Sequence, residues 1–197
     1  MNESVLNMSL NWVDIVLLFI FLLGLFVARK NEFKVEVYYF FGTIFTTFIA
    51  LHYFSGFSLY LNRNFMVPDS MEESLAFCLL AGLTYSLFMV SEGGWNSLLS
   101  LSVPSFVNKW GALALCVFRN LLFSGLLYMV LLMVGDGALT VDVKSSVTSP
   151  FFKRVSVVTY STIFDVIVKP LNSHEKFNDR VYQIVNKPWI KQKRPRE

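Results

Sequence analysis

Residues 37–61 read VYYFFGTIFTTFIALHYFSGFSLYL, a run of 25 residues without a charged side chain. A helix needs about 20 predominantly apolar residues to cross the hydrocarbon core of a bilayer, and 25 residues leave room for some tilt. Tyrosines gather near both ends, at Tyr38 and Tyr39 and again at Tyr53 and Tyr60. Amphipathic rings prefer the two membrane–water interfaces. This stretch therefore predicts a membrane-spanning helix.

Three further apolar stretches flank it. Residues 110–135 form a run of 26 that is interrupted only by Arg119. Residues 75–91 form a shorter candidate, and the uncharged run 15–28 becomes 17 residues long when Trp12 and Asp14 are included. We therefore expect an all-α membrane protein with about four transmembrane helices. They would occupy residues 12–28, 37–61, 74–91 and 110–134, within a transmembrane domain of residues 10–135.

The composition supports this fold class. Of the 197 residues, 54% are hydrophobic and 16% are charged, whereas a soluble domain carries about 25% charged residues. Disorder is excluded because it requires low hydrophobicity together with high net charge. The basic residues are also unevenly distributed, since 11 of the 17 Lys and Arg follow residue 135.

Residues 136–171 are predicted to form an amphipathic segment. Ser149 is a candidate N-cap, Pro150 suits the first position of a helix, and Pro170 would stop it. Apolar residues recur between them with a partial helical period, which favours a helix lying on the membrane or packed against the bundle.

Residues 172–197 are predicted to form a basic polar tail. Anionic lipid headgroups attract such a cluster of charges, and the alternative is a tail that is simply solvated. No nucleic-acid binding is expected, because base-stacking aromatic residues do not alternate with the charges. The basic residues concerned are Lys187, Lys191, Lys193, Arg194 and Arg196.

Basic residues near the predicted spans are balanced between the two sides of the membrane. The positive-inside rule compares Lys and Arg in the flanking loops. One side would carry Arg29, Lys30, Lys34 and Lys109, and the other would carry Arg63, Lys144, Lys153 and Arg154. With four on each side, both orientations of the termini stay open.

Small residues recur at four-residue spacing in two of the predicted spans. Such stripes let helices approach closely in lipid, where packing holds them together. We expect them to form a helix–helix seam. They comprise Gly42, Thr46 and Ala50 in one span, and Ala112, Cys116, Asn120 and Ser124 in the other.

Arg119 is the most unusual residue within the spans. An unpaired charge at membrane depth costs ~3 kcal/mol on insertion scales. Arg119 could serve a transport pathway or a docking surface, or it could snorkel or form a buried structural pair with Asp14 or Glu92. Asp14 in turn could handle protons, or it could be an acidic residue of a first helical turn, which the helix dipole favours.

The sequence contains no catalytic motif of the hydrolase, zinc-protease, P-loop or dinucleotide-binding type. His52 is expected to be a buried hydrogen-bonding residue, and Cys78 and Cys116 are expected to be small core residues. We therefore expect no enzyme activity, and no catalytic, cofactor-binding or metal-binding residues.

Several short motifs resemble those of the CvpA family of bacterial inner-membrane proteins, named for colicin V production. Trp12, Val13 and Asp14 match the family's W-[IV]-D, and His52 with Tyr53 matches its H-Y pair. Three further residues fit its spacing. Arg29 stands 13 residues before Gly42, and Lys109 stands ten before Arg119, like the two arginines of D-R-x-x-G-x-x-x-G-x-x-R-G.

The resemblance covers residues 10–168 and includes departures. Ala112, Cys116 and Asn120 replace glycines of the last motif, and Lys30 and Lys34 replace a glycine and a glutamate.

The resemblance implies a multi-pass protein of the bacterial inner membrane. Its expected role is a non-enzymatic accessory or scaffold in envelope function or in colicin V production and export. Its partners would be the lipid bilayer and other membrane proteins or further copies of itself. The alternative is a small transporter or channel subunit with a polar pathway near Arg119. The candidate functional or packing residues are Asp14, Arg29, Gly42, Arg119 and Asn120.

Overall fold

The computed structural model describes residues 10–28, 31–68, 71–98, 104–134, 138–172 and 174–186. Within these ranges all regular elements are helices, which confirms the all-α prediction. The elements are α1 (Trp12–Ala28), α2 (Phe33–Phe65), α3 (Glu72–Leu98), α4 (Ser105–Val134), α5 (Ala138–Ser145), α6 (Ser149–Ile163), the π-helical turn η1 (Phe164–Val168), α7 (Lys169–Leu171) and α8 (Arg180–Asn186).

Three of these helices are long and apolar enough to cross a membrane: α2, α3 as far as Gly94, and α4. Helix α1 is apolar but shorter, with 17 residues. At 1.5 Å per residue it is about 25 Å long, close to the lower limit for a span. The chain is therefore an all-α membrane protein.

The long helices extend beyond the predicted apolar runs. Helix α2 occupies 33–65 rather than 37–61, α3 continues to 98, and α4 begins at 105. Hydropathy detects only the lipid-soluble part of a helix, whereas the helix itself continues to a backbone signal. Helix α2 ends where Met66 adopts a left-handed conformation (φ 49°) and donates its N–H to the carbonyl of Asn62. The extension places Glu36 inside α2.

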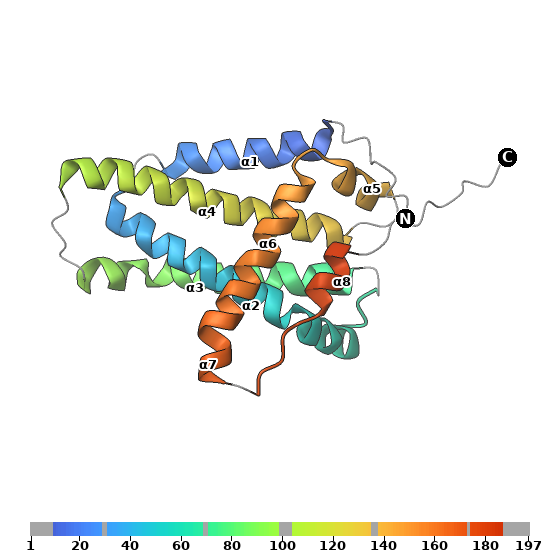
Figure 1. The fold of residues 1–197 in the computed structure, drawn as a ribbon. Coiled ribbons are helices and arrows are strands. Elements are labelled where there is room, and N and C mark those ends of the chain that lie inside the picture. Colours follow the sequence, from blue (N-terminus) through green and yellow to red (C-terminus); the bar gives the residue numbers. More distant parts are fainter. Residues whose placement is uncertain are drawn as a thin grey trace.

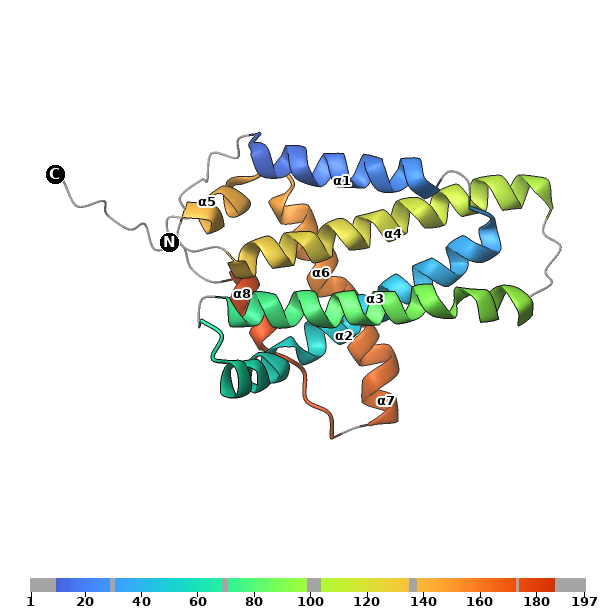
Figure 2. The ribbon, with the colours of Figure 1, turned by 180° about the vertical axis from the view of Figure 1, so that it is seen from behind.

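The bundle is crossed by its own C-terminal helices (Figures 1 and 2). Helix α2 packs against α3 and α4, and α1 packs against α4. Helix α6 runs steeply across α4 and α2 on one face of the bundle, and α3 lies on the other face. The C-terminal third therefore braces the membrane helices from one side.

The crossing helix continues through a π-helical turn. Helix α6 begins at Ser149 with Pro150 in its first turn, and its N-cap is Thr148, one residue before the predicted cap. Proline has no N–H, and its ring collides with the carbonyl four residues earlier. A wider π turn accommodates that collision, and η1 ends two residues before Pro170. The continuous helical segment formed by α6, η1 and α7 then ends at Leu171.

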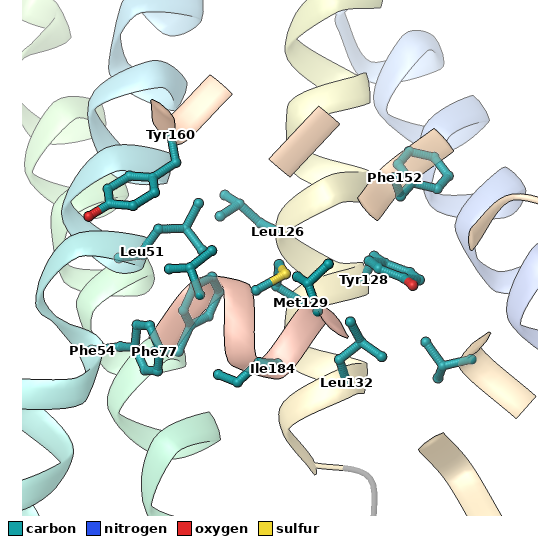
Figure 3. Close-up of a cluster of buried hydrophobic side chains, with 14 of the residues drawn as sticks. Leu51, Phe54, Phe77, Leu126, Tyr128, Met129, Leu132, Phe152, Tyr160 and Ile184 are labelled. Carbon is teal, nitrogen blue, oxygen red and sulfur yellow. The ribbon is translucent and has the colours of Figure 1, made fainter. Parts of the chain in front are cut away.

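Helix α8 returns to the hydrophobic core (Figure 3), which corrects the expectation of a polar tail from residue 172. Val181, Ile184 and Val185 are buried, and Ile184 lies among core residues of α2, α3, α4 and α6. The three residues share one helix face, a pattern too short to stand out within a polar stretch. The labelled core residues from the other helices are Leu51, Phe54, Phe77, Leu126, Tyr128, Met129, Leu132, Phe152 and Tyr160.

Replacing Val181 by aspartate should detach α8. Val181 is fully buried, and a charge placed there costs ~3 kcal/mol or more. We expect the Tm of the detergent-solubilised protein to fall by about 6–12 °C in a thermal melt followed by circular dichroism. The matched control is Gln183→Asp, because Gln183 is exposed. Equal shifts in both variants would contradict the burial of α8.

Candidate functional site

The Arg119 side chain forms an ion pair with Glu36 inside the bundle. Its Nη1 lies 3.3 Å from Glu36 Oε2, and the two side chains are 8% and 0% exposed. Arg119 belongs to α4 and Glu36 to the first turn of α2. Asn31 Nδ2 donates a 2.7 Å hydrogen bond to the other carboxylate oxygen, Oε1.

Two contacts fix the start of α2 beside the first turns of α4. The N–H of Phe33 donates to Asn108 Oδ1 at 2.8 Å. The Phe33 ring also packs closely against Gly111 of α4. A Cβ at position 111 would lie only 2.7 Å from the nearest ring atom, so this close contact requires glycine. Long helical side chains point back toward their own N-terminus. Arg119 therefore reaches toward Glu36.

An aromatic ring connects this pair to a third helix. The Cζ atom of Arg119 lies 5.3 Å from the centroid of the Tyr39 ring, within reach of a cation–π attraction. The Tyr39 hydroxyl donates a hydrogen bond to Glu92 in α3. We call Glu36, Tyr39, Glu92 and Arg119 the Arg119 cluster, and it joins α2, α3 and α4.

The observed partner corrects one interpretation of Arg119. Asp14 was a candidate partner, but its carboxylate is engaged elsewhere. It accepts hydrogen bonds from the Thr148 hydroxyl (2.7 Å) and N–H (3.0 Å), from the Ser146 hydroxyl and from the N–H groups of Asn11 and Val147. Asp14 thus fastens the start of α1 to the turn that leads into α6.

The neighbours of Asp14 strengthen this attachment. Trp12 Nε1 donates to the carboxylate of Asp142 in α5 at 2.9 Å, and Val13 is fully buried. Asn11 Nδ2 donates to the Asp142 carbonyl at 2.6 Å. Each residue of the Trp12-Val13-Asp14 motif therefore contacts the C-terminal helices or the core. Asp14 is thus a structural attachment point as well as an acidic residue in the first turn of α1.

The small-residue stripes are buried, but Gly42 and Asn120 face different neighbours. A Cβ on Gly42 would lie 3.0 Å from the Phe88 ring of α3. Asn120 is packed against Gly24 of α1, where a Cβ would stand only 2.1 Å from Asn120 Oδ1. The two residues therefore serve the α2–α3 and α1–α4 contacts, rather than a single seam between α2 and α4.

His52 links α2 to the C-terminal segment, and it is buried and hydrogen-bonded as expected. Its Nδ1 lies 2.8 Å from the Tyr160 hydroxyl and its Nε2 lies 3.0 Å from Glu175 Oε1. The Tyr160 oxygen accepts the N–H of Asn178 at 2.9 Å. Burial raises the pKa of Tyr160 to about 12, so its phenol is neutral at ordinary pH and can donate to Nδ1.

Other candidates fall outside the Arg119 cluster. Among the described residues Cys78 and Cys116 are free. Cys116 is buried as expected, but Cys78 is exposed on α3, so the expectation that it is a core residue was wrong. No group of three or more His, Cys, Asp and Glu side chains in the described ranges could hold a metal ion. The remaining predicted residues lie outside the described ranges, namely Arg29, Lys187, Lys191, Lys193, Arg194 and Arg196.

Sequence analysis missed Glu36. Glu36 directly precedes the uncharged run 37–61 and therefore falls outside the predicted span. The available signal was the absence of a helix breaker between residues 33 and 37, which lets the helix begin one turn earlier.

A model of the family described as "Colicin V production protein" matches residues 13–157. No curated protein and no solved structure matches the chain. The matched range contains the Arg119 cluster, Asp14 with its hydrogen-bond partners in the turn before α6, and both Gly42 and Asn120. It ends within α6 and does not include α8.

A double-mutant cycle should reveal strong coupling between Arg119 and Glu36. Arg119→Leu alone leaves a buried carboxylate without its cation, which costs ~3–5 kcal/mol, whereas replacing both members by leucine should recover most of that loss. The measurement is the free energy of unfolding in detergent micelles.

The pair of Lys34 and Glu32 provides the control, because its side chains are 30% and 58% exposed. Its cycle, with both residues replaced by leucine, should give a coupling below about 1 kcal/mol. Additive losses for Arg119 and Glu36 would show that the buried pair does not act as a unit.

Tyr160→Phe should loosen residues 174–186. The change leaves the N–H of Asn178 and Nδ1 of His52 without their partner, at a cost of ~1–3 kcal/mol. Hydrogen exchange of this segment should accelerate about fivefold or more, whereas Tyr182→Phe, at a residue that is 39% exposed, should not change it. Because the pKa of Tyr160 is raised, its contribution is complete below about pH 10 and declines as the pH rises toward 12. Unchanged exchange would contradict the role of this hydroxyl.

Proposed function

The chain belongs to the Colicin V production protein family, and from this premise we propose that it is a non-enzymatic accessory or scaffold protein. It would cross the bacterial inner membrane several times and support colicin V production or export. It would act by packing its helices against a membrane partner or a second copy of itself.

The Arg119–Glu36 pair is the observation that carries this proposal. A pathway residue would face a watery cavity or a ligand, whereas Arg119 is neutralised by a carboxylate of its own chain. Asp14 and Asn120, the other polar residues of the alternative transport pathway, are also engaged by neighbouring helices. This arrangement favours a structural protein over a transporter.

The occupied histidine supports a non-enzymatic role. Both ring nitrogens of His52 are within hydrogen-bond distance of a partner, Tyr160 on one side and Glu175 on the other. A general base must lie within hydrogen-bond reach of the substrate proton that it removes, and His52 is buried with both of its partners in its own chain. His52 instead holds the C-terminal segment to α2.

Helix α3 offers the surface best suited to a partner helix. In its most apolar stretch 22% of the residues are buried, compared with 44% in α2 and 50% in α4. A Cβ at Gly82, Gly93 or Gly94 would meet nothing within 4 Å. Small residues on an open face allow another helix to approach closely in lipid.

Gly82→Ile should therefore weaken the association. A loss of close packing worth about 1.4 kcal/mol lowers the occupancy of a weak partner about tenfold. We expect a similar fall in secreted colicin V activity from cells that depend on this chain, and in crosslinking of α3 to its partner. Gly56→Ile is the matched control, because Gly56 in α2 also has open space around it.

Two results would contradict the scaffold role. One is undiminished crosslinking and colicin V activity in Gly82→Ile cells. The other is ion or solute flux through liposomes containing the protein, abolished by Arg119→Ala while assembly survives, which would establish the transporter alternative.

A further inference from the structure

An apolar groove lies where α6 crosses the membrane helices. Its volume is about 470 Å³, in the range of pockets that hold small ligands. Its walls are Phe40 and Ile44 of α2, Phe118 and Leu122 of α4, and Val155 and Val158 of α6. The groove is thus bounded by three helices and lined almost entirely by hydrocarbon.

One cation lies at this groove and a second lies beside it. Arg154 of α6 is exposed and is the one charged residue among those lining the groove. On the other side of α6 a second groove of about 400 Å³ is lined by Lys153 and again by Arg154. Neither groove has an acidic lining residue. Within the described part of the chain, neither cation forms an ion pair.

The groove lies alongside the apolar length of α4. Ser156 of α6 donates to the carbonyl of Gly125, which is nine residues, or about 14 Å, from the end of α4 at Val134. Phe118 and Leu122 lie further into the helix. Acyl chains are the surrounding solvent at such a position, so the natural occupant of this hydrocarbon-lined space is a lipid chain.

The cations select the kind of lipid. A guanidinium matches a phosphate oxygen pair with two parallel hydrogen bonds, and an unpaired cation next to hydrocarbon is costly. We propose that α6, α4 and α2 form a binding site for an anionic phospholipid. The acyl chain would occupy the 470 Å³ groove, and Arg154, assisted by Lys153, would hold the headgroup phosphate.

The site is independent of the scaffold role. It requires only that the bundle is embedded in a membrane, and α6, which carries Arg154, lies on the face of the bundle opposite α3. A bound lipid would fill the angle between α6 and the spanning helices and would neutralise Arg154. The α3 experiments and the lipid experiment can therefore fail separately.

The test is retention of phosphatidylglycerol. The full-length protein is incubated with mixed micelles containing equal amounts of phosphatidylglycerol and phosphatidylcholine, and bound lipid is counted by native mass spectrometry. We expect one phosphatidylglycerol per chain, at least fivefold preferred over phosphatidylcholine. Arg154→Gln should lower its retention about fivefold, and Lys169→Gln, at an exposed cation outside both grooves, should not.

A second variant tests the groove itself. Val158→Trp places a bulky ring in the space for the acyl chain and should reduce the retention of both lipids. Val166→Trp is the matched control, because Val166 is exposed and lines neither groove. These positions are on the surface, and circular dichroism verifies the fold of each variant.

Four outcomes would overturn the proposal. Equal retention of the two lipids would show that Arg154 and Lys153 do not select for an anionic headgroup. Retention that survives Arg154→Gln would indicate binding elsewhere, such as the basic residues after 186. Displacement of the lipid by millimolar inorganic phosphate would identify a site for a free anion. Crosslinking between two chains through Val158→Cys would show that a second copy occupies the groove.

Discussion

A guanidinium inside a bundle of apolar helices must be neutralised, and the position of Arg119 imposes this constraint on the rest of the structure. Glu36 supplies the neutralising carboxylate, which requires α2 to begin at Phe33 and to lie beside the first turns of α4. Tyr39 then places its ring near the guanidinium and its hydroxyl on Glu92, which positions α3. One buried charge thus fixes the relative placement of three helices.

The C-terminal third solves a second problem, the attachment of a crossing helix to the membrane bundle. Two polar anchors hold it, one at Asp14 and one at His52. Between them Ser156 bonds to the backbone of Gly125, where the absence of a side chain permits the approach. In this chain Asp14 of the Trp12-Val13-Asp14 motif and His52 of the His52-Tyr53 pair supply the membrane-helix half of each anchor. Both residues therefore attach the C-terminal helices to the membrane helices.

The fold class could be predicted from the sequence, whereas most of the candidate site could not. Runs such as 37–61 reveal a membrane helix because the length and apolarity of a run are local properties. The burial of His52 and the unusual position of Arg119 within an apolar run were also predictable from the neighbouring residues. The partner of Arg119 was not, because Glu36 is separated from it by 83 positions and the two meet only once α2 and α4 have packed. Gly42 and Asn120 show the same limit, since spacing identifies a small-residue face without identifying the helix that it meets.

The sequence by itself determined that this protein is a helical membrane protein and that it resembles the family to which it belongs. Only the tertiary structure decided that Arg119 is paired with Glu36, that α6 crosses the bundle and leaves a groove beside Arg154, and that α8 returns to the core. The physical reason is the range of the interactions. Burial in lipid depends on about 20 consecutive residues, whereas an ion pair, an anchor or a groove depends on helices that are distant in the chain and adjacent in space.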